Sequence, residues 1–94
     1  MEIRVKFIGS LRSAAGNSRL TLEMKKTVSL REAVKEIVNR HPKLKRALID
    51  PELCDPRPNA LILVNERDVS VLDGLETVLK DGDEVVFVPI LHGG

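Results

Sequence analysis

The sequence predicts an α+β roll, in which one mixed sheet of about five strands wraps on one main helix. Strand patterns occur near both ends of the chain, as alternating apolar and charged residues at residues 2–8 and as a mainly apolar strand at residues 84–88. The strongest helical pattern lies between them, at residues 29–39. The length of 94 residues suits one small domain with a single modest core.

Composition and charge exclude several classes of function. Hydrophobic residues make up 43% of the chain, charged residues 31%, and the net charge is +1. This balance is not typical of a dedicated nucleic-acid binder or of a membrane-surface protein. The lone Cys54 excludes an internal disulfide and a multi-cysteine metal site, and we expect no metal centre. Because no apolar run is long enough to span a membrane and no signal-peptide pattern opens the chain, we expect a cytoplasmic protein.

The first half of the chain predicts two strands. In residues 2–8, Ile3, Val5 and Phe7 share one face and alternate with charged residues, as in a half-buried strand. Residues 9–17 are expected to form a loop that could contain a helical turn. A second alternating segment follows, with its apolar face made by Leu20, Leu22 and Met24.

A helix is predicted to begin after Ser29. Ser29 and Glu32 have the spacing of a capping box, in which each side chain satisfies a backbone N–H of the other residue. The apolar residues that follow form one stripe at helical spacing: Leu30, Ala33, Val34, Ile37 and Val38. Pro42 ends this helix and can begin a second short one over residues 43–49. Pro51, Pro56 and Pro58 then mark an irregular connection.

The second half predicts three further strands. Residues 60–64 form a continuous apolar run, which we interpret as a strand buried on both faces. Residues 65–68 are expected to turn the chain into a short edge strand at residues 69–71. Leu75, Val78 and Leu79 suggest a helical turn. The last strand, residues 84–88, is expected to lie in the sheet centre, parallel to the first.

The segment after Pro89 carries the chemistry. Its five residues, Ile90 to Gly94, can reach roughly 16 Å beyond the fold. Because glycine has no Cβ, Gly93 and Gly94 can enter a channel that would exclude any side chain. The terminal carboxylate is ionised and is a poor electrophile, so it requires activation, most naturally as an acyl-adenylate formed by an ATP-using partner. The activated carbonyl can then accept sulfur or acylate a thiol or an amine.

The last strand also predicts a docking surface. If Val85 and Phe87 pack on the helix, Val86 and Val88 point outward. We expect them to join Ile62 and Val64 of a neighbouring strand in an exposed apolar patch. The alternative is that the second helix or the proline-rich segment covers this face.

Long segments of the chain resemble the β-grasp, ubiquitin-like sulfur carriers. The opening MEIRVKFIGSLRSAAG is similar to the first strand and loop of molybdopterin synthase small subunits. LILVNERDV and LDGLETVLKDGDEVVFVPILHGG resemble the second half of that group. The ending LHGG is also similar to the tail of ubiquitin-related modifiers. The resemblance covers nearly the whole chain and implies a β-grasp domain at residues 1–89 and a flexible tail at residues 90–94.

The resemblance implies a sulfur carrier without an independent active site and without a bound cofactor. A partner of the ubiquitin-activating type would use ATP to adenylate Gly94, which then becomes a thiocarboxylate. Gly93, His92, Leu91 and Ile90 would thread into the partner, and Val88 would occupy the outward position that meets it.

The resemblance leaves three possible roles. In the molybdopterin branch, which we place first, sulfur goes to a precursor held by a large synthase subunit. In the modifier branch, it goes to transfer RNA, or the tail is joined to target lysines. The third alternative is a passive interaction module. Molybdopterin synthase small subunits tend to carry an aromatic residue at the position of Val88 and proline at that of Ile90.

Other candidate residues have simpler interpretations. Cys54 lies in the proline-rich connection and is interpreted as incidental rather than as a sulfur-relay thiol. His92 is interpreted as a spacer rather than as a catalytic base. The basic run around Lys43 and Arg46 is typical of a solvated helix face, with contact to RNA as the alternative. The acidic residues beside Gly82 fit a turn better than a metal site.

Overall fold

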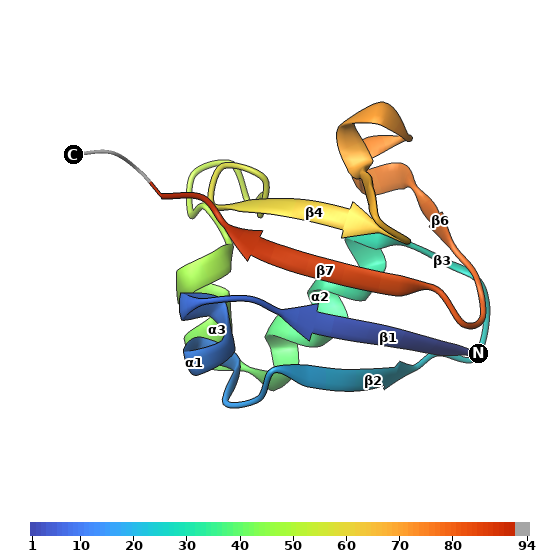
Figure 1. The fold of residues 1–94 in the computed structure, drawn as a ribbon, viewed down its shortest axis with the longest axis horizontal. Coiled ribbons are helices and arrows are strands. Elements are labelled where there is room, and N and C mark those ends of the chain that lie inside the picture. Colours follow the sequence, from blue (N-terminus) through green and yellow to red (C-terminus); the bar gives the residue numbers. More distant parts are fainter. Residues whose placement is uncertain (92–94) are drawn as a thin grey trace.

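The computed structural model describes residues 1–91, and its main feature is a mixed sheet with helices on one face (Figure 1). The order of its five strands is β2-β1-β7-β4-β5. Their bounds are β1 Glu2–Phe7, β2 Arg19–Glu23, β4 Ala60–Val64, β5 Arg67–Asp68 and β7 Glu84–Pro89. As predicted, β7 lies in the centre and pairs in parallel with β1, so that Val5 faces Val85 across the pair. This α+β arrangement is the β-grasp fold.

Helix α2 (Leu30–Arg40) lies against the inner face of the sheet and begins where the sequence predicts. The Glu32 N–H donates to the Ser29 Oγ at 3.2 Å, and the Glu32 carboxylate accepts in return from the Ser29 backbone N–H. This capping box satisfies backbone donors that a helix start otherwise leaves without partners. The whole predicted apolar stripe is buried: Leu30, Ala33, Val34, Ile37 and Val38.

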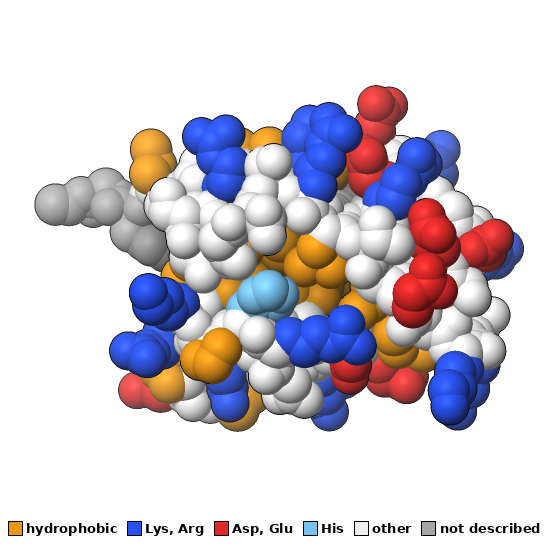
Figure 2. All heavy atoms as spheres, turned by 90° about the horizontal axis from the view of Figure 1, so that it is seen from below, with side chains coloured by type: hydrophobic (Ala, Val, Ile, Leu, Met, Phe, Trp, Pro, Cys, Tyr) orange, Lys and Arg blue, Asp and Glu red, His pale blue; other side chains and the backbone are white. Residues whose placement is uncertain are grey.

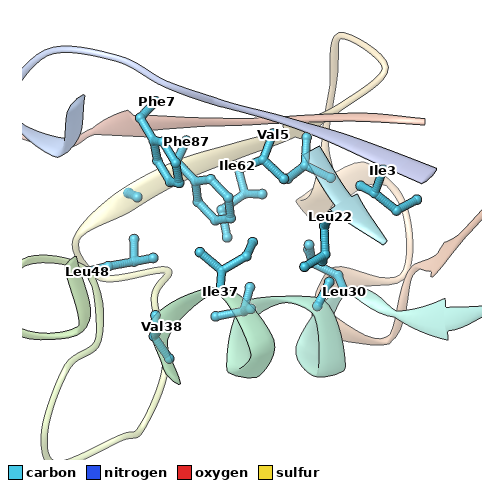
Figure 3. Close-up of a cluster of buried hydrophobic side chains, with 14 of the residues drawn as sticks. Ile3, Val5, Phe7, Leu22, Leu30, Ile37, Val38, Leu48, Ile62 and Phe87 are labelled. Carbon is cyan, nitrogen blue, oxygen red and sulfur yellow. The ribbon is translucent and has the colours of Figure 1, made fainter. Parts of the chain in front are cut away.

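The core forms where this stripe meets the inner side chains of the sheet (Figure 3). Phe7 and Phe87 come from the two central strands, and their rings stack with centroids 5.7 Å apart. Figure 3 places Ile37 of α2 below this pair. Phe87 and Val85 are both fully buried, so the predicted inner face of the last strand is confirmed.

Two short helices stand at the end of the sheet where β7 finishes. Helix α1 (Ser10–Ala15) occupies the segment expected to be mainly loop. Its flanking glycines, Gly9 and Gly16, have φ of 57° and 82°, values that favour glycine. Helix α3 (Pro42–Leu48) agrees with the predicted second helix and has Pro42 in its first turn. The two helices pack against each other and bury Leu11, Leu44 and Leu48.

The predicted edge strand at residues 69–71 is wrong. Those residues form a 3-10 helix, η1 (Val69–Val71), and the edge strand is the preceding β5. The Asp68 carboxylate explains the change, because it accepts the Ser70 N–H at 2.8 Å and so caps the 3-10 turn.

The predicted helical turn is also shifted. Its structured part is a second 3-10 helix, η2 (Gly74–Glu76). Val78 and Leu79 instead form β6, which pairs with β3 (Val28–Ser29) in a separate two-stranded sheet. Strands of two residues carry no detectable alternation, so this small sheet was not predicted.

The prediction that β4 is buried on both faces is wrong as well. Ala60, Ile62 and Val64 are buried, but Leu61 is 38% exposed and Leu63 is only partly buried. Because the helices cover one face of the sheet, an apolar run in β4 places half of its side chains on the open face.

The connection between α3 and β4 is held by Asp55. Its carboxylate accepts the Arg57 backbone N–H at 2.8 Å and the Arg57 Nε–H at 3.0 Å. The Asp50 N–H donates to the Asp55 carbonyl at 2.9 Å and closes the loop between the two residues. The side-chain hydrogen bond with Arg57 holds the pKa of Asp55 below its ordinary value of 3.8. The same bond raises the pKa of Arg57. The proline-rich segment is therefore an ordered loop.

Replacing Phe87 should test the central core contact. Phe87→Ala is expected to lower the free energy of unfolding by about 3–5 kcal/mol, because it leaves a cavity beside Phe7 and Ile37. Val86→Ala is the matched control on the same strand and should cost less than about 1 kcal/mol, because that side chain faces outward. Urea unfolding measures both values, and equal losses would contradict the assigned faces of β7.

Replacing Asp55 should make stability depend differently on pH. Since the folded pKa of Asp55 is depressed, its ionised form stabilises the fold above the unfolded pKa, and this contribution is lost as pH falls through the folded pKa. Asp55→Asn is expected to lower the free energy of unfolding by only about 1 kcal/mol at neutral pH, because the Arg57 side chain is half-exposed and water weakens the ion pair. The difference from wild type should shrink below about pH 3.8 in urea titrations. A gap that stays constant with pH would exclude the ion pair as its source.

Candidate functional site

The base of the C-terminal tail is held where three segments meet. The Ile90 N–H donates to the Asn59 carbonyl at 3.0 Å, and the Asn59 side-chain amide donates to the Leu48 carbonyl at 3.1 Å. Strand β7 is thereby tied to the end of α3 just before the tail leaves the fold. Backbone and side-chain hydrogen bonds together therefore fix the point from which the tail starts.

Gly9 makes room for the last residue of β7. A Cβ built on Gly9 would lie 3.2 Å from the Pro89 Cγ, and the φ of 57° is itself unfavourable for other residues. Pro89 therefore packs directly on the backbone at the start of α1. Any larger residue at Gly9 would push against the base of the tail.

Beyond Pro89 the described chain moves away from the core. Ile90 is 42% exposed and Leu91 is 91% exposed. Both were predicted to belong to the tail, and neither packs into the domain. Gly94, which is predicted to carry the reaction, and the tail residues Gly93 and His92 lie outside the described residues.

The outward orientation predicted for side chains of the docking face is confirmed on β7 and wrong on β4. Val86 and Val88 are partly buried and lie on the face opposite the helices. Ile62 and Val64, which were expected beside them, are 1% and 5% exposed and point into the core. The β4–β7 register explains the error, because Ile62 lies opposite buried Phe87.

The same register identifies the residues that replace them. Leu61 lies opposite Val88, and Leu63 lies opposite Val86. Residues directly opposite in a sheet share a face, so these four side chains form one surface, here called the outer apolar patch. The alternative in which α3 or the proline-rich segment covers this face is not supported. Helix α3 packs on α1 and α2, and Cys54 and Pro56 of the proline-rich segment border a hollow beside α2. The patch borders the base of the tail, since Val88 precedes Pro89.

Other candidate residues lie away from the tail and the outer apolar patch. Cys54 is exposed and lines a hollow of about 290 Å³ between α2 and the proline-rich loop. Lys43 and Arg46 border another hollow of about 440 Å³, together with residues of α1. No cluster of potential metal-ligating side chains occurs among residues 1–91. The described part of the chain also has no helix long and apolar enough to cross a membrane.

Comparison with known proteins identifies the family. The model of the ThiS family matches residues 5–94. The chain belongs to the ThiS family. It is thus a small β-grasp sulfur carrier of the ubiquitin-like type, and the predicted family and fold class are confirmed.

Individual relatives span both branches considered above. Ubiquitin-related modifier 1 of Schizosaccharomyces pombe is 32% identical over 100 residues, covering all of both chains. The small archaeal modifier protein 1 of Methanosarcina acetivorans is 30% identical, with a TM-score of 0.82 over 99% of this chain and 96% of that one. A putative molybdopterin converting factor, subunit 1, from Pyrococcus furiosus is 28% identical, with a TM-score of 0.77 over 97% and 99%.

A charge on the outer apolar patch should leave this ThiS-family fold intact. Val88→Asp is expected to lower the free energy of unfolding by no more than about 1 kcal/mol, because the carboxylate can reach water. Ile62→Asp, one strand away, should unfold the domain or cost several kcal/mol, because it buries an unpaired charge. Thermal unfolding followed by circular dichroism distinguishes them. If Val88→Asp were the more damaging variant, the patch would be part of the core.

Proposed function

We propose that this protein carries sulfur as a thiocarboxylate on Gly94 and acts in the modifier branch of its family. The observation that carries the proposal is the full-length likeness to a ubiquitin-related modifier, together with a family match that extends through Gly94. The relevant acceptors are transfer RNA, which would receive the sulfur, or lysine side chains of target proteins, to which the tail would be joined.

The proposed chemistry needs a partner for every catalytic step. The Gly94 carboxylate attacks the α-phosphorus of ATP and releases pyrophosphate, which leaves an acyl-adenylate. A hydrosulfide equivalent then adds to the carbonyl, AMP leaves, and the thiocarboxylate remains. The ThiS-family chain supplies the reacting carbonyl and two glycines without side chains, so that a narrow channel can admit them. ATP is bound by the partner, an activating enzyme of the ubiquitin-activating type.

The geometry supports this division of labour. Ile90, the hydrogen-bonded base of the tail, is followed by Leu91, which is 91% exposed and therefore available to a partner. The outer apolar patch lies beside that base, where a partner that binds the tail can also bury Leu61 and Val88. We propose that this patch, rather than one containing Ile62 and Val64, docks on the activating enzyme.

A second candidate is the role placed first by sequence analysis, the small subunit of molybdopterin synthase. It is favoured by the likeness to the Pyrococcus furiosus converting-factor subunit, which spans 97% of this chain. We rank it second because Val88 and Ile90 stand where that branch tends to carry an aromatic residue and a proline.

The carrier chemistry can be tested by intact-mass spectrometry. The mature protein should end at Gly94 and, with its host's adenylating enzyme, ATP and a sulfur donor, should gain the mass of one oxygen-to-sulfur replacement. A variant with one alanine appended after Gly94 should fold normally but show no exchange, because its carboxylate is displaced and carries a side chain. The proposal fails if the extended variant exchanges as well as wild type.

The choice of branch needs a separate experiment in the host. Isopeptide adducts that end in Gly94, or loss of thiolated transfer RNA on deletion, would support the modifier role. Stable copurification with a large molybdopterin synthase subunit, without either of those effects, would support the second candidate instead.

A further inference from the structure

Strand β2 forms one edge of the main sheet and leaves alternate backbone groups without a strand partner. It pairs with β1 on one side only. The Phe7 N–H donates to the Ser18 carbonyl, and the Met24 N–H donates to the Met1 carbonyl. In an antiparallel pair such bonds recur at every second residue. The even-numbered residues of β2 therefore bond to β1, and the N–H and C=O groups of Arg19, Thr21 and Glu23 point to the free edge.

At both ends of β2 the residue directly opposite on β1 carries a like charge. Arg19 lies directly opposite Lys6 on β1, and Glu23 lies directly opposite Glu2. Like charges in such positions repel each other. Neither Arg19 nor Glu23 belongs to an ion pair among residues 1–91, and both are exposed. Figure 2 views the molecule from below, on the side of β2. It shows acidic side chains gathered on the right, the side on which the N-terminus of the chain lies in Figure 1.

We propose that the free edge of β2 pairs with β2 of a second copy of this chain, antiparallel and centred on Thr21. This register places Arg19 opposite Glu23 of the second copy, and Glu23 opposite Arg19 of the second copy. It also brings together the backbone groups that point outward, so that three residue pairs can exchange roughly six hydrogen bonds. Shifting the strands by two residues in either direction loses one of these pairs and both charge matches.

The register relieves the repulsion found in the single chain. A line drawn across the strands on the outer face passes from Lys6 to Arg19 of one copy and then to Glu23 and Glu2 of the second copy. The two-fold axis produces an equivalent line in the opposite direction. Each pair of like charges thus acquires an opposite pair beside it. A binding peptide of unrelated sequence would not supply this self-complementary pattern, which is why a second copy is the favoured occupant.

The inner face of the junction is apolar. Leu20 would lie opposite Leu22 of the second copy, and Leu20 is only partly buried in the single chain. Because the two-fold axis is perpendicular to the sheet, both copies keep their helices on the same side.

The contact is small, and the association is therefore weak. A five-residue edge buries less than the roughly 1,200 Å² at the low end of stable complexes. We expect a dissociation constant of roughly 0.1–1 mM, so that the dimer forms at high local concentration. β2 is separated from β7 by β1, and pairing at β2 leaves the outer apolar patch and the tail accessible.

Charge reversal provides a sharp test of this pairing. In sedimentation equilibrium at concentrations up to about 1 mM, wild type should dimerise, and Arg19→Glu or Glu23→Arg alone should weaken the dimer roughly tenfold or more. An equimolar mixture of the two variants should associate again, because each supplies the charges that the other repels. Arg12→Glu, a matched reversal on α1, should dimerise like wild type.

A backbone variant tests the hydrogen bonds independently. Thr21→Pro removes an N–H that points to the free edge and not to β1, so it should fold yet remain monomeric, whereas Thr21→Val should still dimerise. Thermal unfolding verifies that each variant is folded. In NMR dilution of wild type, amide shifts should change along β2.

Three results would overturn the proposal. The first is a wild type that stays monomeric up to about 1 mM. The second is a mixture of the two charge variants that does not associate. The third is a set of concentration-dependent NMR amide shifts confined to the outer apolar patch. The sulfur-exchange assay is independent of all three, so either proposal can fail without the other.

Discussion

The parallel pairing of β1 with β7 is the constraint on which the rest of this structure depends. It joins the two ends of the chain in the sheet centre and stacks Phe7 on Phe87 above α2. Strands β2 and β4 pair directly with these two strands, and α1 packs against both of them. Because β7 is buried and central, its end is a fixed point, and a segment that leaves from it starts from a defined position.

This constraint separates the two faces of the sheet. The inner face carries the core and contributes most of the stability through buried apolar area. The outer face is free of helices, so apolar residues placed there by alternation remain accessible for a partner. In this ThiS-family chain the accessible leucines of β4 lie beside Val86 and Val88 and close to the tail. Stability and recognition thus use alternate residues of the same strands.

The elements with strong local signals could be predicted from the sequence. The capping box at Ser29, the stripe on α2 and the alternation of β1 each follow from one periodicity or one pair of side chains. The parallel placement of β7 was also predicted, because a roll around one helix leaves few other positions for the last strand. Among the short elements, α3 was predicted from Pro42, whereas α1 was expected only as a turn within a loop and η1 was missed. The helix α1 depends on Gly9 and Gly16 in left-handed conformations, and η1 depends on the Asp68 side chain.

The candidate site was predicted in part, for a physical reason. The inner face of β7 was assigned only conditionally, because residues 85–88 are apolar at every position and the burial of Val85 and Phe87 was assumed. Residues 60–64 are apolar at every position, so their sequence cannot tell which set faces the core. Only the register with β7 decides that Ile62 is inside and Leu61 outside. An apolar run on a strand with one open face is ambiguous until its neighbour is known.

The contact between Gly9 and Pro89 has a consequence for protein engineering. Since the missing Cβ at Gly9 seats the last residue of β7, the exit of the tail is governed by a position near the opposite end of the chain. A tail transplanted onto another domain of this fold would leave at the intended angle only if the recipient had a glycine in the corresponding loop. Tail and loop therefore form one transferable unit, although few residues of the chain are further apart in sequence.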